Sequence, residues 1–373
     1  MTWCSQTSSF IFNQEIKNIC ILIKNIIARG MNMIITAYQP EWIREDFIDF
    51  IAEKVHPTWA WKKVKVELIS QRNLSDDFVE LKLRPNQNFK QNNVRAGQSI
   101  LVTLTLQGVR QQRSYSVVEI TAQGNVVIAV KKQGRVSHAL CNLKRGDVLE
   151  ISQAQGDFIL DVSAHKQATL LLASGSGITA IYALAVEHLK KSTQNLDLIY
   201  FSRDDAYLPE LHSLLQQYPQ FKLHYFNTTQ QQQHLQLELI QQYIPDFQQR
   251  MCYACGAAAL MKSAQQIYQD LDIFAQLKTE FFQFRANENI TAQPVQFLRA
   301  QQSFMAQGSL LDSAEHAGLK PASGCRMGVC NTCSCTKLNG SVQNMLTGEV
   351  SHEPNTQIKL CISQALTPVT INL

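Results

Sequence analysis

Four cysteines near the C-terminus constrain this chain more than any other feature. Cys325, Cys330 and Cys333 follow the spacing Cys-x4-Cys-x2-Cys, and the fourth, Cys361, lies well downstream. This spacing is typical of the thiolate ligands of a 2Fe-2S cluster, whose last ligand comes from a distant part of the chain. Glycine and serine residues around the first three cysteines would let the backbone wrap closely and aim its N–H groups at cluster sulfurs.

A structural zinc site is the alternative for these four residues. Zinc sites normally show two Cys-x2-Cys pairs, or histidines at matched spacing, and the sequence around the cysteines has neither. We therefore expect the iron-sulfur cluster. Cys335 follows the third predicted ligand closely and is expected to be a spectator, although it is the obvious candidate for an exchanged ligand.

Length and composition favour several domains in a reducing compartment. A chain of 373 residues exceeds what one hydrophobic core normally serves. The net charge of +4, with 17% charged residues and no long basic block, argues against nucleic acid as a partner. Ten cysteines without a short cysteine-dense module suit a reducing compartment, so we expect a cytoplasmic protein.

Residues 1–60 are expected to form an N-terminal helical extension. Residues 10–27 are rich in isoleucine but are interrupted by charges, so they are not predicted to span a membrane, and they lack the features of a secretory signal. They could form an interfacial amphipathic helix, but we favour a natural start of synthesis at Met31 or Met33. Apolar residues at helical spacing follow, at Ile43, Phe47, Phe50 and Ile51.

Residues 61–162 are predicted to form an antiparallel β-barrel. Short runs of alternating apolar and polar residues recur there, separated by turn residues, a pattern typical of small barrels. Six strands are predicted, over residues 64–69, 78–83, 100–106, 115–120, 126–130 and 148–151.

Residues 163–284 have a different pattern, in which continuous apolar runs alternate with helical stretches. This alternation predicts an α/β domain with a parallel sheet covered by helices on both faces. Strands are predicted over 169–173, 196–201, 222–226 and 251–254, and helices over 178–189, 208–216, 235–243 and 257–271. A polar linker, residues 285–294, then leads to a C-terminal module, residues 295–373, with a strand over 295–298 and a helix over 309–315.

Two segments of the predicted barrel are suited to a flavin. Arg113, Tyr115 and Ser116 lie where a strand is expected to begin, and they combine a cation for phosphate, a flat aromatic ring and a hydroxyl group. About twenty residues later, Gly134 opens a short predicted helix whose N–H groups can hold a phosphate. One such segment is weak evidence, because Arg and Tyr are common on exposed strands, but two in one barrel favour a flavin.

A dinucleotide-binding loop is predicted where the strand 169–173 ends and a helix begins. Gly175 and Gly177 lie in that loop, which is the context required of a pyrophosphate-binding turn. The next strand ends at Ser202 and Arg203, where such domains meet the adenosine ribose. These two side chains could hold a 2′-phosphate and so favour NADPH slightly, although the two aspartates that follow weaken the inference.

Cys255 and Gly256 follow the predicted strand 251–254 at the edge of the sheet where ligands bind. A small buried side chain is the plain interpretation of Cys255, but its position favours a nicotinamide neighbour. Cys252, within the strand, is expected to lie in the core.

Together these motifs resemble the ferredoxin-NADP reductase superfamily, in its iron-sulfur flavoprotein branch with a C-terminal plant-type ferredoxin domain. The resemblance covers roughly residues 63–373 and implies an α+β, β-grasp fold for the C-terminal module. It also implies FAD, with FMN less favoured, together with the 2Fe-2S cluster and NADPH or NADH. By the same resemblance Arg113 would bind the flavin phosphates, Tyr115 would stack on the isoalloxazine, and Ser116 would face the reactive ring nitrogen.

The resemblance assigns further site residues. Ser116, Cys255 and Glu280 are the residues expected to act in catalysis. The other residues expected to bind the flavin or the nucleotide are Gly134, Val136, Ser137, Gly175, Gly177, Thr179, Ser202, Arg203, Gly256 and Phe281. The family usually has proline where this chain has Ala180 and Ala257, and we expect altered loop stiffness there without loss of binding.

The implied activity is that of an NAD(P)H:acceptor oxidoreductase. Electrons would pass from NAD(P)H to FAD, then singly to the cluster and to an acceptor protein. The first expectation for that acceptor is a membrane fatty-acid desaturase, with peripheral membrane contact through it. A role as the reductase component of an aromatic-ring or alkyl-group oxygenase is the alternative, and a redox-sensing regulatory flavoprotein is the alternative from another class.

Overall fold

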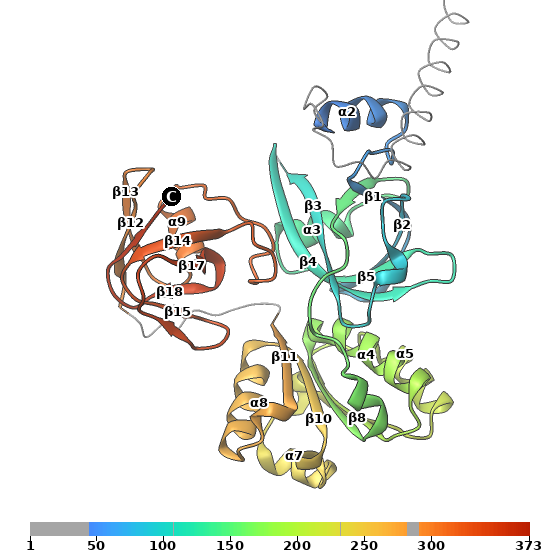
Figure 1. The fold of residues 1–373 in the computed structure, drawn as a ribbon. Helices are drawn as coiled ribbons and strands as arrows, with labels where there is room; N and C mark the ends of the chain where they lie inside the picture. Colours follow the sequence, from blue (N-terminus) through green and yellow to red (C-terminus); the bar gives the residue numbers. More distant parts are fainter. Residues whose placement is uncertain (1–44, 107, 232, 282–290) are drawn as a thin grey trace, which may run out of the picture. The chain divides into compact units, whose positions relative to one another are not determined.

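The computed structural model describes residues 45–106, 108–231, 233–281 and 291–373 (Figure 1). The chain divides into two compact units, residues 1–63 and 64–373. In the first unit, α2 (Glu45–Val55) buries Asp49, whose carboxylate accepts the Trp61 N–H at 2.6 Å and pairs with Lys63 at 3.4 Å. Phe50 is 55% exposed, so the helix does not bury every apolar residue of the predicted face.

The predictions for residues 10–27, for a start at Met31 or Met33 and for Ile43 lie outside the described residues. Within the described ranges, no helix has the length and apolar character needed to cross a lipid bilayer.

Six antiparallel strands form a closed barrel in the second unit, as the sequence predicts. They are β1 (Val64–Ser75), β2 (Phe78–Pro85), β3 (Ser99–Leu106), β4 (Val109–Ile120), β5 (Val126–Lys131) and β6 (Val148–Ile151), in the order β1-β2-β5-β4-β3-β6. The prediction that Arg113 lies where β4 begins is wrong. Pairing with β3 starts at Leu106 and Val109 and continues through polar residues, so Arg113 lies well inside the strand.

A parallel five-stranded sheet follows, in the order β11-β10-β7-β8-β9. Its strands are β7 (Thr169–Ser174), β8 (Leu196–Ser202), β9 (Phe221–Asn227), β10 (Met251–Gly256) and β11 (Leu277–Phe281). The edge strand β11 was not predicted, because polar residues interrupt its apolar pattern and only its pairing with β10 makes it a strand. Cys255 and Gly256, predicted to follow the strand, are its last residues.

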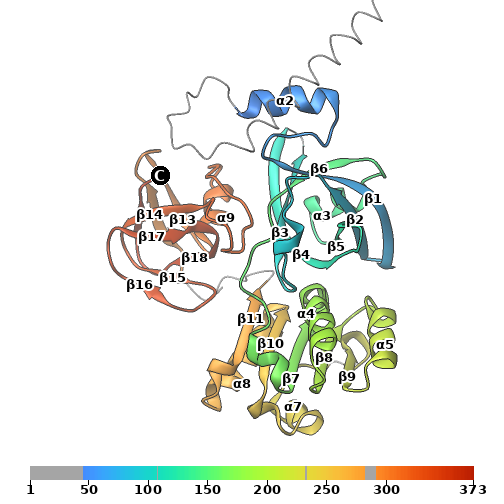
Figure 2. The same cartoon turned by 45° about the vertical axis from the view of Figure 1, so that its right-hand side comes forward.

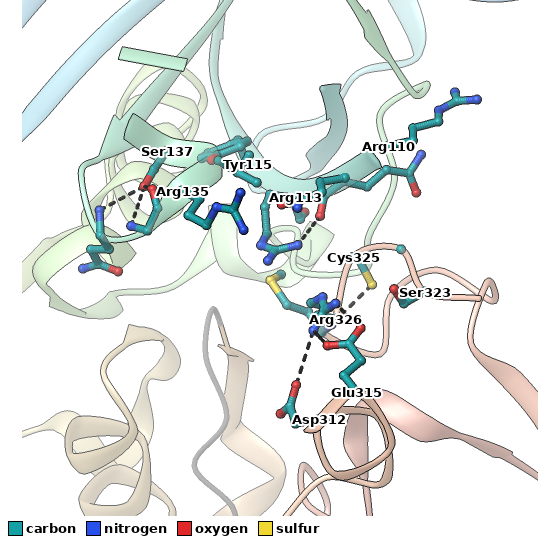
Figure 3. A pocket seen from close by; sticks show the side chains of 18 of the residues that line it. Arg110, Arg113, Tyr115, Arg135, Ser137, Asp312, Glu315, Ser323, Cys325 and Arg326 are labelled. Carbon is teal, nitrogen blue, oxygen red and sulfur yellow. Dashed lines mark hydrogen bonds and ion pairs between the residues drawn. The ribbon is translucent and has the colours of Figure 1, made fainter. Parts of the chain in front are cut away.

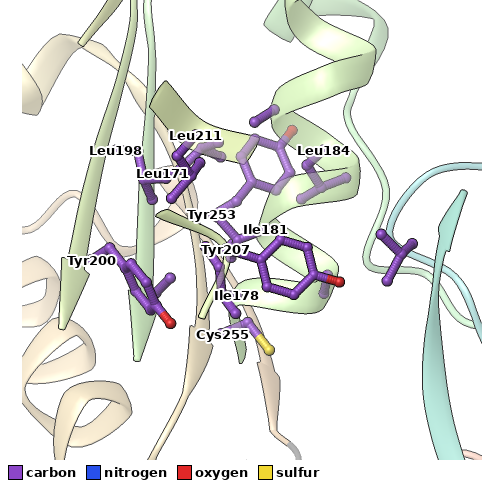
Figure 4. Packing of buried hydrophobic residues seen from close by; sticks show 14 of the residues in the cluster. Leu171, Ile178, Ile181, Leu184, Leu198, Tyr200, Tyr207, Leu211, Tyr253 and Cys255 are labelled. Atoms are coloured by element: carbon purple, nitrogen blue, oxygen red, sulfur yellow. The ribbon is translucent and has the colours of Figure 1, made fainter. Parts of the chain in front are cut away.

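Helices cover both faces of this sheet, as predicted, because successive strand residues point to opposite sides. Leu171 and Ala173 pack with α4 (Ile178–Lys191) and α5 (Leu208–Gln217), in the cluster drawn in Figure 4. Leu170 and Leu172 pack on the other face with α7 (Leu237–Tyr243) and α8 (Ala258–Asp270), and Cys252 lies in this second core. Two short helices, α3 (Arg135–Cys141) and α6 (Thr228–Gln231), lie in the barrel and after β9.

The strand order places a topological switch between β7 and β10. The chain moves from β7 outward to β9 and then returns to the other side of β7 to form β10 and β11. The loops that leave β7 and β10 therefore lie side by side at one edge of the sheet. In open α/β sheets, ligands bind in the crevice that such a switch creates.

The C-terminal module is a β-grasp-like α+β domain, shown in orange and red in Figures 1 and 2. Its first sheet has the order β13-β12-β19-β14-β17, and its second has the order β16-β15-β18. The strands are β12 (Gln293–Phe297), β13 (Gln302–Ala306), β14 (Ser334–Asn339), β15 (Val342–Asn344), β16 (Val350–Ser351), β17 (Thr356–Lys359), β18 (Ser363–Ala365) and β19 (Val369–Ile371).

The structure confirms one prediction for this module and modifies another. The helix α9 (Leu310–His316) forms as predicted, and the Ser309 side chain caps it by accepting the Asp312 N–H at 3.0 Å. The strand β12 begins at Gln293, inside the predicted linker 285–294, because Gln293 pairs with Ala306 of β13. Only the last four residues of that linker are described.

Candidate functional site

The four predicted cluster ligands lie in two pairs. The N–H of Cys325 donates to the sulfur of Cys330, and the N–H of Cys330 donates to the sulfur of Cys325, both at 3.2 Å. The sulfurs of Cys333 and Cys361 are 3.3 Å apart. The chain thus brings the distant fourth cysteine to the loop that carries the first three.

The backbone wraps closely around these sulfurs, as the small residues predict. A β-carbon on Gly324 would lie 2.7 Å from the sulfur of Cys330, so only glycine fits there. Arg326 and Gly328 adopt the left-handed conformation, with φ of 59° and 75°. The turn they make lets the Met327 N–H donate to the Cys325 sulfur at 3.4 Å.

This arrangement fits a 2Fe-2S cluster, in which each iron takes two thiolates. In the part of the chain that the structure describes, no group of three or more His, Cys, Asp or Glu side chains converges as a ligand set for one ion. Within each thiol pair, the hydrogen bond lowers the pKa of one member, Cys330 to about 4 and Cys333 to about 6, and raises that of its partner, Cys325 or Cys361. One sulfur of each pair therefore ionises readily, which is the form that binds metal. Cys335 packs in the apolar core, and burial raises its pKa to about 12.

A cavity of about 1070 Å³ lies beside this cluster loop (Figure 3). Its wall includes β4 of the barrel, the turn before α3, two residues of the nucleotide loop, and residues 323–327 of the cluster loop. Residues predicted from four separate sequence motifs therefore face one space. The predicted site residues among them are Arg113, Tyr115, Ser116, Gly134, Val136, Ser137, Thr179 and Cys325.

Four arginines, Arg110, Arg113, Arg135 and Arg326, place positive charge on the wall of this cavity. Arg113 donates to the backbone oxygen of Gln112 at 2.7 Å, and burial, with a smaller effect from the nearby charge of Arg326, lowers its pKa. Arg326 is held by ion pairs with Glu315 and Asp312 on α9. Its charge is thus balanced, whereas Arg113 remains available to fork onto a phosphate.

Tyr115 and Ser116 follow Arg113 on the same strand. Burial raises the pKa of the Tyr115 hydroxyl, so this ring stays neutral and apolar enough to stack. The Ser116 hydroxyl is buried and has no hydrogen-bond partner within the described residues. A buried polar group of this kind normally has a partner, and a polar ring atom of a ligand in the cavity would supply one.

The second predicted phosphate loop is held by its own serine. The Ser137 hydroxyl accepts the N–H groups of Gln133 and Gly134, both at 2.9 Å, and so caps α3. No atom lies within 4 Å of where a β-carbon of Gly134 would be, which leaves space on that side. The Val136 side chain is buried in the barrel core, so only its backbone could reach a phosphate.

The glycine loops after β7 and β10 interlock at the topological switch. Gly175 has φ of 53°, and a β-carbon on Gly177 would overlap the carbonyl oxygen of Cys255. A β-carbon on Gly256 would likewise overlap the hydroxyl of Ser174. Thr179 donates to the backbone oxygen of Ser176 at 3.0 Å, which fixes the first turn of α4.

Ala257 makes a bond that proline could not make. Its N–H donates to the Ser174 hydroxyl at 2.8 Å and ties the two loops together. The alanine that departs from the family pattern therefore has a structural role in this chain.

Cys255 and Glu280 are neighbours on β10 and β11 but do not line the cavity. Cys255 is fully buried, and burial raises its pKa well above the ordinary value. Burial also raises the pKa of Glu280 to about 8, and one of its carboxylate oxygens is buried without a partner among the described residues. Phe281 is the last residue of β11. These residues form a second group at the switch, beside the glycine loops.

The end of β8 carries the predicted ribose contacts. Ser202 is buried and Arg203 is exposed. Asp204, which follows them, is bound by Lys131 of the barrel at 2.9 Å. Sequence patterns alone did not reveal that pair, because the two residues lie on different domains.

Two further cavity residues were missed from the sequence. Gln112 reaches the cluster loop, where its side-chain oxygen would lie 3.1 Å from a β-carbon on Gly324. Arg326, which follows the first predicted ligand, also lines the cavity and was not predicted as a site residue. Its location between two ligands was a signal that it faces the cluster surroundings, but its partners on α9 could not be read from spacing.

Three family models match the chain in series. The oxidoreductase FAD-binding domain matches residues 65–159, and the oxidoreductase NAD-binding domain matches residues 171–266. The 2Fe-2S iron-sulfur cluster binding domain matches residues 297–366. The barrel thus matches an FAD-binding model, the parallel sheet an NAD-binding model and the C-terminal module a 2Fe-2S model. Each is the cofactor that the sequence predicted for that domain.

Several known proteins are also similar to the chain over most of its length. An NADPH oxidoreductase of Mycobacterium tuberculosis is 28% identical, over 83% of this chain and 84% of that protein. The 3-chlorobenzoate-3,4-dioxygenase reductase subunit of Comamonas testosteroni is 24% identical, over 87% of this chain and 100% of that protein. A solved phthalate dioxygenase reductase shares the fold, with a TM-score of 0.56 at 22% identity, over 83% of this chain and 98% of that one.

Proposed function

Because the chain belongs to the ferredoxin-NADP reductase superfamily and carries a C-terminal 2Fe-2S domain, we propose that it passes electrons from NADPH to an oxygenase. The chain is an oxidoreductase with FAD-binding, NAD(P)-binding and 2Fe-2S domains, the organisation of the reductases of oxygenase systems. The cavity that brings β4, the nucleotide loop and the cluster loop to one space is the observation that most directly supports the proposal.

The flavin, when bound, lets a two-electron donor serve a one-electron cluster. In the proposal, Arg113 holds the flavin phosphate, Tyr115 stacks on the ring, and the unpartnered hydroxyl of Ser116 bonds to it. Cys325, Cys330, Cys333 and Cys361 hold the cluster, and Cys325 lines the same cavity.

The glycine loops and the buried pair at the switch would serve the nucleotide. Gly177 and Gly256 let the backbone approach a pyrophosphate closely, because neither position has room for a β-carbon. Cys255 and Glu280 would border the nicotinamide, and the raised pKa of Glu280 would keep that side chain uncharged at neutral pH. A neutral carboxyl donates a hydrogen bond and does not repel a nearby negative group.

For the acceptor we propose the reductase component of an aromatic-ring or alkyl-group oxygenase system. The dioxygenase reductase subunit whose entire length matches 87% of this chain supports this choice. The expectation of a desaturase has no support among the relatives named above. A cytoplasmic location and the predicted domain boundaries remain predictions.

The first experiment mixes the purified, cofactor-loaded protein with NADPH or NADH under anaerobic conditions. Bleaching of the flavin absorbance followed by the electron paramagnetic resonance signal of the reduced cluster is expected. Turnover with ferricyanide should reach roughly tens per second, within the ordinary range for enzymes. Flavin reduction without any cluster reduction would contradict the proposed route.

The second experiment supplies an acceptor. The reductase is combined with purified oxygenase components and, separately, with a membrane desaturase, both chosen from genes adjacent to that of the chain. Product formed in proportion to NADPH consumed is expected with an oxygenase. Product with the desaturase alone would overturn the proposed acceptor and leave the electron route intact.

A further inference from the structure

The loop after β8 holds two acidic residues. At this place in the fold, an acidic residue is expected to favour NADH over NADPH. In nucleotide-binding sheets, a carboxylate at the end of this strand hydrogen-bonds the free 2′-hydroxyl of the adenosine ribose and repels a 2′-phosphate. Asp204 and Asp205 occupy that region, directly after Ser202 and Arg203. Which nucleotide the loop selects therefore depends on whether these carboxylates are free.

The Asp204 carboxylate is already fully engaged within the protein. One oxygen accepts from Lys131 Nζ at 2.9 Å, and the other accepts the Ala206 N–H at 3.2 Å and the Ser202 hydroxyl at 3.4 Å. Both members of the ion pair are mostly shielded, with Lys131 17% exposed and Asp204 22% exposed. A pair of this kind is screened less by salt than one on the open surface.

The other charged groups of the loop leave one cation facing outward. Asp205 accepts a hydrogen bond from the Tyr225 hydroxyl at 3.1 Å. Arg203 is exposed, and no ion pair is recorded for it in the described ranges. Because Lys131 neutralises Asp204, Arg203 is left in the loop as a cation that can bind a phosphate. The opposing negative charge there is that of Asp205, which is partly engaged by Tyr225.

Lys131 comes from the flavin domain. It is the last residue of β5, and its ammonium group lies 5.8 Å from the centre of the Phe78 ring, which helps to hold it in place. The residue that neutralises the ribose loop thus belongs to a different domain from the loop itself.

We propose that Lys131 is a specificity-determining residue, which makes the nucleotide site accept NADPH by neutralising Asp204 from the flavin barrel. This inference rests on the proposed function and deepens it by naming the residue that selects the nucleotide. Lys131 acts through Asp204, so loss of its charge should free a carboxylate beside the ribose. The 2′-phosphate would then be repelled, whereas a 2′-hydroxyl would not.

The test uses the cofactor-loaded full-length protein and four forms of it: wild type, Lys131→Met, Lys131→Arg and Lys131→Met combined with Asp204→Asn. Competitive inhibition by adenosine 2′,5′-bisphosphate and by 5′-AMP is measured for each, with the KM values for NADPH and NADH. In Lys131→Met, binding of the bisphosphate and the KM for NADPH should each worsen about tenfold, the size expected for one unpaired charge near a surface. The values for 5′-AMP and NADH should change less than about twofold.

Lys131→Arg should behave as wild type, and the double variant should regain the wild-type preference. That recovery is the decisive readout, because removing Asp204 could not restore a contact that Lys131 made to the flavin or a fold that was lost. Equal changes for both nucleotides, or no recovery in the double variant, would overturn the inference. Failure of either nucleotide to reduce wild-type flavin would instead overturn the proposed function.

Discussion

Gly177 packs so closely against Cys255 that a β-carbon on Gly177 would overlap the carbonyl oxygen of Cys255. The first residue belongs to the loop after β7 and the second is near the end of β10, so the contact joins the two strands on either side of the topological switch. The glycine is therefore required by a tertiary contact as well as by the approach of a nucleotide.

Gly177→Ala should separate these two loops. The added methyl group has no room, so the backbone must shift, at a cost of about 1–3 kcal/mol in the free energy of unfolding. In this variant the melting temperature should fall and the KM for the nucleotide should rise. Gly134→Ala is the matched control for stability, because nothing lies within 4 Å of its β-carbon position, and its melting temperature should stay close to that of wild type.

Cys333→Ala should abolish the cluster and leave the flavin. Its partner Cys361 cannot hold the second iron alone, so iron content and the paramagnetic signal should both disappear, while the nucleotide still bleaches the flavin. Cys335→Ala is the control, since this thiol packs in the apolar core. A cluster retained in Cys333→Ala but lost in Cys335→Ala would show that the ligands had been exchanged.

Ser116→Ala should slow reduction of the flavin. The hydroxyl is buried without a partner in the described part of the chain, and its loss removes one hydrogen bond to the ligand that fills the cavity. Loss of a positioned donor of this kind typically lowers the rate about a hundredfold. Stopped-flow flavin reduction measures the effect, and Ser116→Thr should recover much of the rate. Normal kinetics in Ser116→Ala would remove this residue from the catalytic assignment.

Glu280 should make stability depend on pH. Burial raises its pKa from 4.5 to about 8, so the folded protein binds this proton more tightly than the unfolded chain does. The stabilisation is therefore fully present below about pH 4.5 and is lost as pH rises through about 8. Glu280→Gln carries no such proton and should keep its stability across this range.

Thermal unfolding of both proteins, at equal flavin content, measures the difference. At pH 9 the Gln variant should be the more stable by about 2–4 kcal/mol, and near pH 5 the two should agree. Glu119→Gln, a change on an exposed carboxylate, should leave the pH profile of wild type unaltered. A wild-type profile that is flat between pH 5 and 9 would contradict the assignment.

Local patterns were enough to predict most of the fold. The strands of the barrel alternate apolar and polar residues, and β7 is a continuous apolar run that leads into Gly175 and Gly177. Such signals depend on residues close together in sequence, so they can be recognised without the tertiary structure. The predicted cluster ligands belong to the same class, because three of the four lie in one short segment.

The missed features all depend on residues far apart in the chain. The edge strand β11 exists because it pairs with β10, and β4 starts early because it pairs with β3. The link between Ala257 and Ser174 joins two loops that are separated by three strands and several helices. No periodicity or motif encodes contacts of this kind.

The amino-acid sequence by itself determined the three domains and the chemical groups they bind, since each motif places its ligands within a few residues of one another. It left open how these groups meet. Only the tertiary structure placed Arg113, Thr179 and Cys325 around one cavity, and only it paired Lys131 with Asp204. The physical reason is that electrostatic and packing contacts depend on distance in space, and the folded chain sets that distance between residues that the sequence keeps far apart.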